Sequence, residues 1–202
     1  MMKFSKVMIP TLATIALGMS VMGTPASAEA TAETKLTQSI TGGEHNVAVT
    51  PVSNFTAVTL SGETQVTNAN PGVLTVTDAT GSGNGWRINV KADQFKVSGD
   101  AKSNRTLPKG SLVLNSGGAA IMKIGGTSSP NPEFKTANFI IDTDNQVTIL
   151  SAKKDEGMGK YNVAFNDKSM ALTLNPHSTY VENKAGATSY ESKLTYSIVT
   201  GP

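Results

Sequence analysis

The residues that most often carry out catalysis are few in this chain and are not grouped. There are two histidines, His45 and His177, which lie far apart in the sequence, and there is no cysteine. The lack of cysteine excludes disulfides, thiol nucleophiles and cysteine–zinc sites. We therefore expect the two histidines to be surface imidazoles rather than catalytic bases or metal ligands.

One serine has the surroundings of a nucleophile. Asn115-Ser116-Gly117-Gly118 is similar to the segment around a serine-protease nucleophile. A triad also needs a base and an orienting carboxylate beside the serine, and the flanks of His45 carry no catalytic signature. The segment is more typical of a glycine-rich hairpin turn.

One acidic run has a composition that suits calcium. Asp142-Thr143-Asp144-Asn145 supplies oxygen ligands, but the positions of an EF-hand loop that need Gly and Glu are occupied by Val147 and Lys153. A looser surface calcium site and a plain Asp/Asn-rich turn both remain open.

No pair of carboxylates stands out for glycoside cleavage. We expect no metal, no cofactor and no enzymatic activity, and a secreted hydrolase is the least favoured function.

Composition also argues against a nucleic-acid partner. Arg87 and Arg105 are the two arginines, and the chain has one Trp, four Tyr and six Phe. Nucleic-acid-binding proteins usually combine a basic face with stacking aromatic rings.

The first 28 residues have the layout of a secretory signal peptide. Met1–Lys6 is short and basic, Val7–Gly23 is apolar and uncharged, and Ala26-Ser27-Ala28 supplies small residues for cleavage after Ala28. The alternative, an uncleaved membrane anchor, is disfavoured because a bilayer span needs about 20 apolar residues. We expect a secreted protein without a membrane span, and its 15 basic residues would balance its 15 acidic ones.

The remaining chain has the period of β-strands. Trp86–Lys91 and Leu194–Ile198 alternate apolar and polar residues, as half-buried strands do. Further short strands are predicted at Asn46–Thr50, Ala57–Leu60, Val73–Thr77, Ser111–Asn115, Ala119–Ile124, Asn138–Asp142, Val147–Ala152, Lys160–Phe165 and Ala171–Asn175. Asp142–Gln146 is interpreted as a hairpin loop between two of them. About a dozen short strands predict an all-β fold, a single-domain sandwich or barrel-like domain over residues 29–202.

Two stretches together resemble a known family. The first is the glycine-rich turn Gly81–Gly85 followed by Trp86-Arg87-Ile88 and, further on, Asp93-Gln94-Phe95. The second is Tyr190 followed by Leu194-Thr195-Tyr196-Ser197-Ile198 near the closing Gly201-Pro202. They are similar to the signature motifs of the WxL-domain family of Gram-positive surface proteins. The chain would be a divergent member, because Ile88 and Ile198 replace the Leu residues and Tyr196 replaces the second Trp.

The resemblance implies a function. WxL proteins attach non-covalently to the cell wall through peptidoglycan, and they often act with a membrane-anchored companion protein. The expected localisation is the cell wall and cell surface, and the expected partner is peptidoglycan or another wall polymer. The candidate ligand-binding or motif residues are Trp86, Arg87, Ile88, Lys91, Tyr190, Leu194, Thr195, Tyr196 and Ile198.

Two interpretations of the aromatic motif residues remain. Trp86 shares a strand face with Ile88 and Val90, which favours a position in the core. Alternatively, Trp86 and Tyr196 form an exposed platform for sugar rings, with Arg87 and Lys91 meeting anionic groups of the wall. A different function, a self-associating extracellular matrix protein, is compatible with Thr- and Gly-rich strands whose edges can pair.

Overall fold

The computed structural model describes residues 32–99, 104–182 and 186–202. The chain divides into two units, Met1–Ser39 and Ile40–Pro202, and the strands belong to the second. The predicted signal peptide, residues 1–28, lies outside the described residues. Residues 32–44 contain no strand, so regular structure begins at His45.

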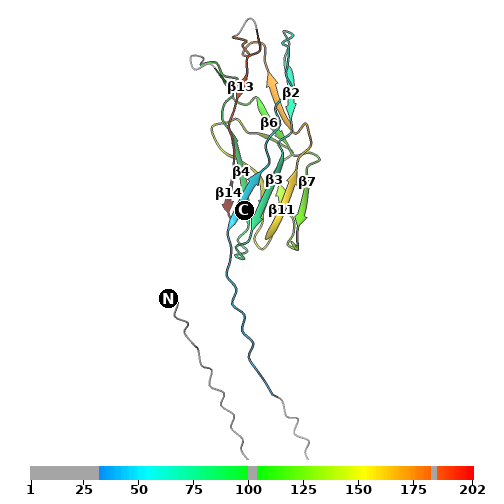
Figure 1. The fold of residues 1–202 in the computed structure, drawn as a ribbon, viewed down its shortest axis with the longest axis vertical. Helices are drawn as coiled ribbons and strands as arrows, with labels where there is room; N and C mark the ends of the chain where they lie inside the picture. Colours follow the sequence, from blue (N-terminus) through cyan, green and yellow to red (C-terminus); the bar gives the residue numbers. More distant parts are fainter. Residues whose placement is uncertain (1–31, 100–103, 183–185) are drawn as a thin grey trace, which may run out of the picture. The chain divides into compact units, whose positions relative to one another are not determined.

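The unit Ile40–Pro202 is all-β, as predicted: the described residues form fourteen strands and no helix (Figure 1). All strand pairs are antiparallel. The β3–β11 sheet has the order β1 (His45–Val49), β3 (Val73–Asp78), β11 (Gly159–Ala164), β7 (Ala120–Ile124). The β4–β14 sheet has the order β14 (Leu194–Thr200), β4 (Trp86–Ala92), β10 (Val147–Ala152), β8 (Glu133–Phe134). The β2–β12 sheet has the order β2 (Gln65–Ala69), β12 (Met170–Leu174), β6 (Leu112–Asn115), β9 (Asn138–Ile140), and β13 (Tyr190–Glu191) pairs with β5 (Lys96–Val97).

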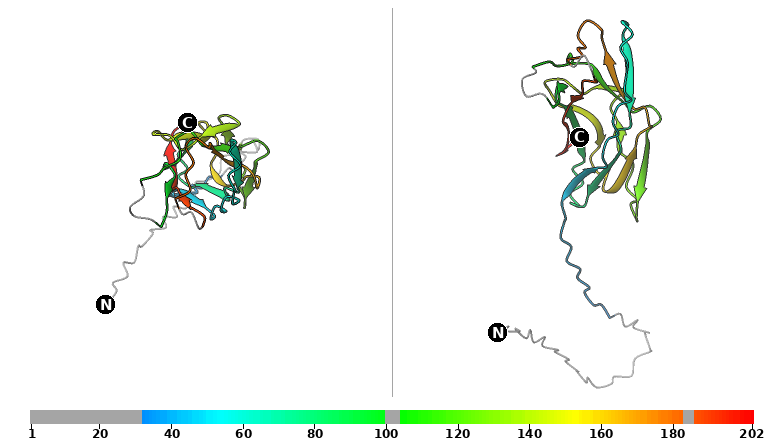
Figure 2. Two further views of the ribbon diagram at one scale, coloured as in Figure 1. Left: turned by 90° about the horizontal axis from the view of Figure 1, so that it is seen from above. Right: turned by 45° about the horizontal axis from the view of Figure 1, so that its top comes forward.

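One hydrophobic core joins the sheets. In β4, buried residues alternate with half-buried ones from Trp86 to Ala92, which places every second side chain inside. The fully buried side chains Leu74, Ile149 and Tyr161 come from β3, β10 and β11 and belong to the same cluster. In the left view of Figure 2, seen from above, the strands are arranged around a common centre. β1 lies against β14, so the β3–β11 and β4–β14 sheets meet along this line.

One predicted strand does not form. Ala57–Leu60 has no strand conformation, whereas the unpredicted β2 begins at Gln65. The residues just before Ala57–Leu60 lie beside β2 but form only scattered hydrogen bonds with it. The Ser53 amide donates to the Asn70 carbonyl at 3.0 Å, and the Thr56 amide donates to the Asn68 carbonyl at 3.3 Å. A β-branched, apolar composition suits a pleated surface, but it does not supply a partner strand in register.

The predicted hairpin loop at Asp142–Gln146 is also wrong. β9 pairs with β6, whereas β10 pairs with β4 and β8, so the segment passes from one sheet to another. The buried Asp142 carboxylate explains the crossing, because it accepts hydrogen bonds from the amides of Gly110 and Ser111, each at 3.0 Å. These bonds hold the end of β9 beside β6.

The turn after Asn115 is likewise not a hairpin. The amide of Ala119 donates to the Ser116 carbonyl at 3.0 Å, which forms a turn. The strands that flank it, β6 and β7, belong to different sheets. The glycine-rich sequence therefore predicted the turn and not the pairing. Among the described residues, no helix is long and apolar enough to cross a membrane.

Candidate functional site

The two motif-bearing strands form one structural unit. β4 and β14 pair over their whole length, with Ile88 opposite Ile198 and Val90 opposite Tyr196. At the ends of the ladder, Trp86 lies opposite Thr200 and Ala92 lies opposite Leu194. Motifs that are more than a hundred residues apart in the sequence are thus direct neighbours in space.

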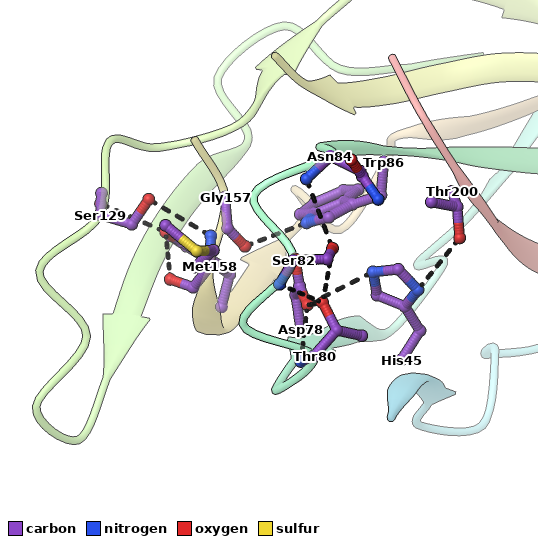
Figure 3. A network of polar contacts seen from close by, with 11 residues as sticks. His45, Asp78, Thr80, Ser82, Asn84, Trp86, Ser129, Gly157, Met158 and Thr200 are labelled. Atoms are coloured by element: carbon purple, nitrogen blue, oxygen red, sulfur yellow. Dashed lines mark hydrogen bonds and ion pairs between the residues drawn. The ribbon is translucent and has the colours of Figure 1, made fainter. Parts of the chain in front are cut away.

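Trp86 is locked in the core. Its side chain has no exposed surface, and its Nε1–H donates to the Gly157 carbonyl at 2.9 Å (Figure 3). Gly157 has a φ of 73°, and a Cβ added there would lie 2.2 Å from the Cβ of Ala152 and 2.8 Å from the Trp86 Nε1. Only glycine fits between the indole and β10 in this conformation.

The core interpretation of Trp86 is confirmed, and the exposed-platform interpretation is wrong for it. Ile88 also has no exposed surface, so neither residue can touch a ligand from outside. Leu194, Tyr196 and Ile198 are half-buried and pack against the core. Burial raises the pKa of Tyr196 to about 12. The Tyr196 hydroxyl is buried and has no hydrogen-bond partner.

The polar face of the motif makes intramolecular contacts. Arg87 Nη1 donates to the carbonyls of Gly201 and Pro202 at 3.3 and 3.4 Å. Lys91 Nζ donates to the Asp144 carbonyl at 2.8 Å, and Lys109 forms an ion pair with the Asp144 carboxylate. The hydrogen bond from Lys109 lowers the pKa of the Asp144 carboxyl. Ligand contacts by Arg87, Lys91 and the exposed Thr195 stay predictions.

Tyr190, the remaining motif residue, belongs to a different region. It lies in the short strand β13, and its hydroxyl donates to the Tyr180 carbonyl at 2.8 Å while it accepts from the Tyr180 amide at 3.3 Å. Burial raises the pKa of the Tyr190 hydroxyl above its ordinary value. These two bonds fix the backbone of Tyr180.

Tyr180 and Tyr190 line a large groove, which we call the β2–β13 groove. Its volume is about 1030 Å³. One wall is the segment Val52–Leu60 beside β2, and the other comprises Thr179–Val181 and Gly186–Ser192 around β13. The floor is apolar and includes Phe95, Leu107, Leu112, Met170 and Leu172. β2 and β13 lie at the end of the unit that is uppermost in Figure 1.

The sequence did not reveal this groove. Its first wall coincides with the wrongly predicted strand Ala57–Leu60, and Tyr180 was not among the candidate residues. The signal was nevertheless present: two of the four tyrosines, Tyr180 and Tyr190, flank a Gly/Ala/Thr/Ser-rich stretch close to the second motif.

Comparison with known proteins identifies the family. The model of one family, WxL domain surface cell wall-binding, matches residues 25–202. The chain belongs to the WxL family. No curated protein and no solved structure gives a significant match. Membership confirms the resemblance seen in the two motifs and places the protein among surface proteins that bind the cell wall.

The structure shows how the WxL domain accommodates its departures from the motifs. Ile88 and Ile198 stand where the family motifs have Leu, and they are direct cross-strand partners. β-branched pairs on neighbouring strands pack well on a pleated surface. The replacements are thus compatible with the same β4–β14 ladder.

The WxL domain also contains one buried polar network that the sequence did not predict. His45 is not a free surface imidazole, because its side chain is 15% exposed and its Nε2 lies 3.3 Å from Oδ1 of the buried Asp78. Its Nδ1 lies 3.5 Å from the Thr200 hydroxyl, and Thr80 donates its hydroxyl to Asp78 at 2.7 Å (Figure 3). The network joins β1, β3 and β14. His177, by contrast, is exposed as predicted.

This network does not have the geometry of a catalytic triad. The Thr200 hydroxyl is farther from His45 than the 2.6–3.2 Å expected between a nucleophile and its base. Ser116, the other nucleophile candidate, is buried and donates its hydroxyl to the Thr136 carbonyl at 2.9 Å. In the part of the WxL domain that the structure describes, no three His, Asp or Glu side chains gather as metal ligands would.

Proposed function

We propose that this protein is exported and binds the Gram-positive cell wall non-covalently through peptidoglycan, without catalysis. The observation that carries the proposal is the family match, which extends over the whole folded unit. The buried Trp86 and Ile88 give the motifs a structural role. Binding is therefore assigned to surfaces that the β4–β14 ladder holds in place.

The charge balance supports recognition by shape and hydrogen bonding. After removal of the predicted signal peptide at residues 1–28, the protein would have equal numbers of acidic and basic residues. Its outward motif cations, Arg87 and Lys91, contact backbone carbonyls. Because the protein would have almost no net charge, its long-range electrostatic attraction to an anionic wall polymer is expected to be weak. A membrane-anchored companion protein remains part of the proposal as a second partner.

A sedimentation experiment tests the proposal. The secreted protein is incubated with washed walls, and in parallel with walls from which the anionic accessory polymers have been removed. Equal retention by both preparations supports peptidoglycan as the ligand. Retention that is lost after stripping would assign the ligand to the anionic polymers, and no retention by either preparation would contradict wall binding.

Self-association through strand edges is a second candidate function. β2 and β9 are the outer strands of the β2–β12 sheet, and their side chains Val66 and Ile140 are 57% and 51% exposed. Exposed apolar edge strands favour pairing between copies. Light scattering over a concentration series distinguishes the two: growth in mass with concentration supports a matrix protein, and a constant monomer that sediments with walls contradicts it.

A further inference from the structure

The chemistry of the β2–β13 groove is that of a site for an uncharged ligand. Glu191 is the one charged side chain among the described residues that line it. The rim is rich in hydroxyls, including those of Thr56, Thr59 and Ser192, whereas the floor is hydrocarbon. Phosphate- or carboxylate-rich polymers would need cations that these lining residues do not supply.

Tyr180 presents an aromatic ring that is already held in place. Tyr180 is 42% exposed, and the Arg105 guanidinium lies 3.8 Å from the centroid of its ring. Arg105 is in turn 3.9 Å from the Glu182 carboxylate, and the Tyr190 hydroxyl holds the Tyr180 backbone. A ring fixed before binding loses little conformational entropy when a ligand stacks on it.

The size of the groove suits a chain. Pockets for small ligands are typically about 300–1,000 Å³, and this groove of about 1030 Å³ lies just above that range. The floor accepts apolar groups, while the hydroxyls and the backbone of Val52–Leu60 offer hydrogen bonds. Amino sugars combine these features, because their C–H faces and acetyl methyls are apolar and their hydroxyl and amide groups form hydrogen bonds.

We propose that the β2–β13 groove binds the uncharged glycan strand of the wall, with one sugar ring stacked on Tyr180. This inference rests on the proposed wall-binding function and gives it a site and a ligand class. It assigns no contact to Trp86. The hydroxyl of Thr179, which is buried in the groove wall without a partner, would gain one from a bound sugar after rotation about χ1.

Binding of a defined oligosaccharide tests the site. The probe is the tetramer of N-acetylglucosamine, titrated into the secreted protein by calorimetry, with poly(glycerol phosphate) as the anionic alternative. We expect Tyr180→Ala to weaken tetramer binding at least tenfold. Ala57→Glu places a carboxylate in the wall of the groove and is expected to weaken it similarly.

The matched control is Ala120→Glu, which introduces the same side chain at an exposed position of β7 that does not line the groove. This variant should bind as the unaltered protein does. Fluorescence of the single tryptophan, Trp86, checks that each variant is folded, because the buried indole lies outside the groove lining.

The outcomes separate the groove from the wall-binding function. If the protein sediments with stripped walls and both groove variants sediment equally well, the groove assignment is wrong and wall binding stands. If the protein binds the tetramer through Tyr180 but does not sediment with walls, the groove assignment is supported and the proposed function fails. Preference for poly(glycerol phosphate) over the tetramer would overturn the glycan assignment.

Discussion

Trp86 owes its importance to its contacts inside the molecule. It begins β4, its ring packs beside Gly157, and its N–H donates to the Gly157 carbonyl. A buried carbonyl without a donor would cost free energy, so the indole has both an apolar and a polar role. The contribution of Trp86 is therefore to the stability of the fold.

The first prediction follows from that burial. Trp86→Ala should lower the free energy of unfolding by about 3–5 kcal/mol, because it leaves a cavity and an unpaired carbonyl. Trp86→Phe, which keeps a ring and loses the N–H, should cost less. Chemical denaturation followed by far-ultraviolet circular dichroism measures both. An Ala variant of unchanged stability that no longer binds walls would contradict the core role.

The second prediction concerns the buried hydroxyl of Tyr196. Its pKa is raised to about 12 in the folded protein, against about 10 in an unfolded chain. Below pH 10 the hydroxyl is protonated in both states. Between pH 10 and 12 the unfolded chain loses the proton first, so stability falls, by at most roughly 2 kcal/mol from this group.

Tyr196→Phe isolates this effect. The variant lacks the unpartnered hydroxyl, so it should be at least as stable as the unaltered protein at pH 8 and should lose less stability between pH 10 and 12. Thermal unfolding at a series of pH values measures the difference. Parallel curves for the two proteins would show that the Tyr196 hydroxyl does not titrate differently on folding.

At the scale of elements, the His45 network attaches β1 to the rest of the fold. β1 is an outer strand of its sheet, and it is held by its ladder with β3, by Val47, which packs against the core, and by His45, which lies beside Asp78 and Thr200. An outer strand with few buried side chains is expected to open locally more readily than a central strand. The imidazole thus compensates for the low burial of β1.

The third prediction tests this attachment. His45→Asn should increase hydrogen exchange of the β1 amides while the amides of β4 and β11 remain protected, because β1 is an outer strand that loses a side-chain contact and the other two are central strands. His177→Asn, at an exposed position, is the control and should change neither. Exchange measured by mass spectrometry on peptides decides the matter. Unchanged exchange in β1 would mean that the backbone ladder alone holds the strand.

At the scale of the whole molecule, charge balance sets how binding responds to salt. With 15 charges of each sign outside the predicted signal peptide, long-range attraction to an anionic wall is expected to be weak. The groove that we assign to the glycan has one charged side chain among its described lining residues. Salt should therefore screen few charge–charge interactions between protein and wall, and the affinity should depend only weakly on ionic strength.

The fourth prediction follows. Raising sodium chloride from 50 to 500 mM should change the affinity for stripped walls by less than about threefold. A basic wall-binding domain that contacts several phosphates, used in parallel, should lose much more. Sedimentation at each salt concentration measures the effect. A steep loss for this protein would indicate a local cationic cluster as the binding surface.

Local features of this protein could be predicted from its sequence. Period-2 alternation gave β4 and β14 and the inward direction of Trp86, because successive side chains on a strand must point to opposite faces. The ordered motif pair indicated the family before any fold was known. Glycines and Asp/Asn runs predicted the turns, since these residues tolerate turn conformations.

The folded chain was needed to show which strands pair and which residues would surround the candidate ligand. Asp142 holds the end of β9 beside β6 through the amides of Gly110 and Ser111, and no local pattern contains that information. The groove needs Val52–Leu60 and the β13 region to face one another across an apolar floor. Such long-range pairings depend on how buried surface and backbone hydrogen bonds are satisfied over the whole chain, so a local pattern cannot specify them.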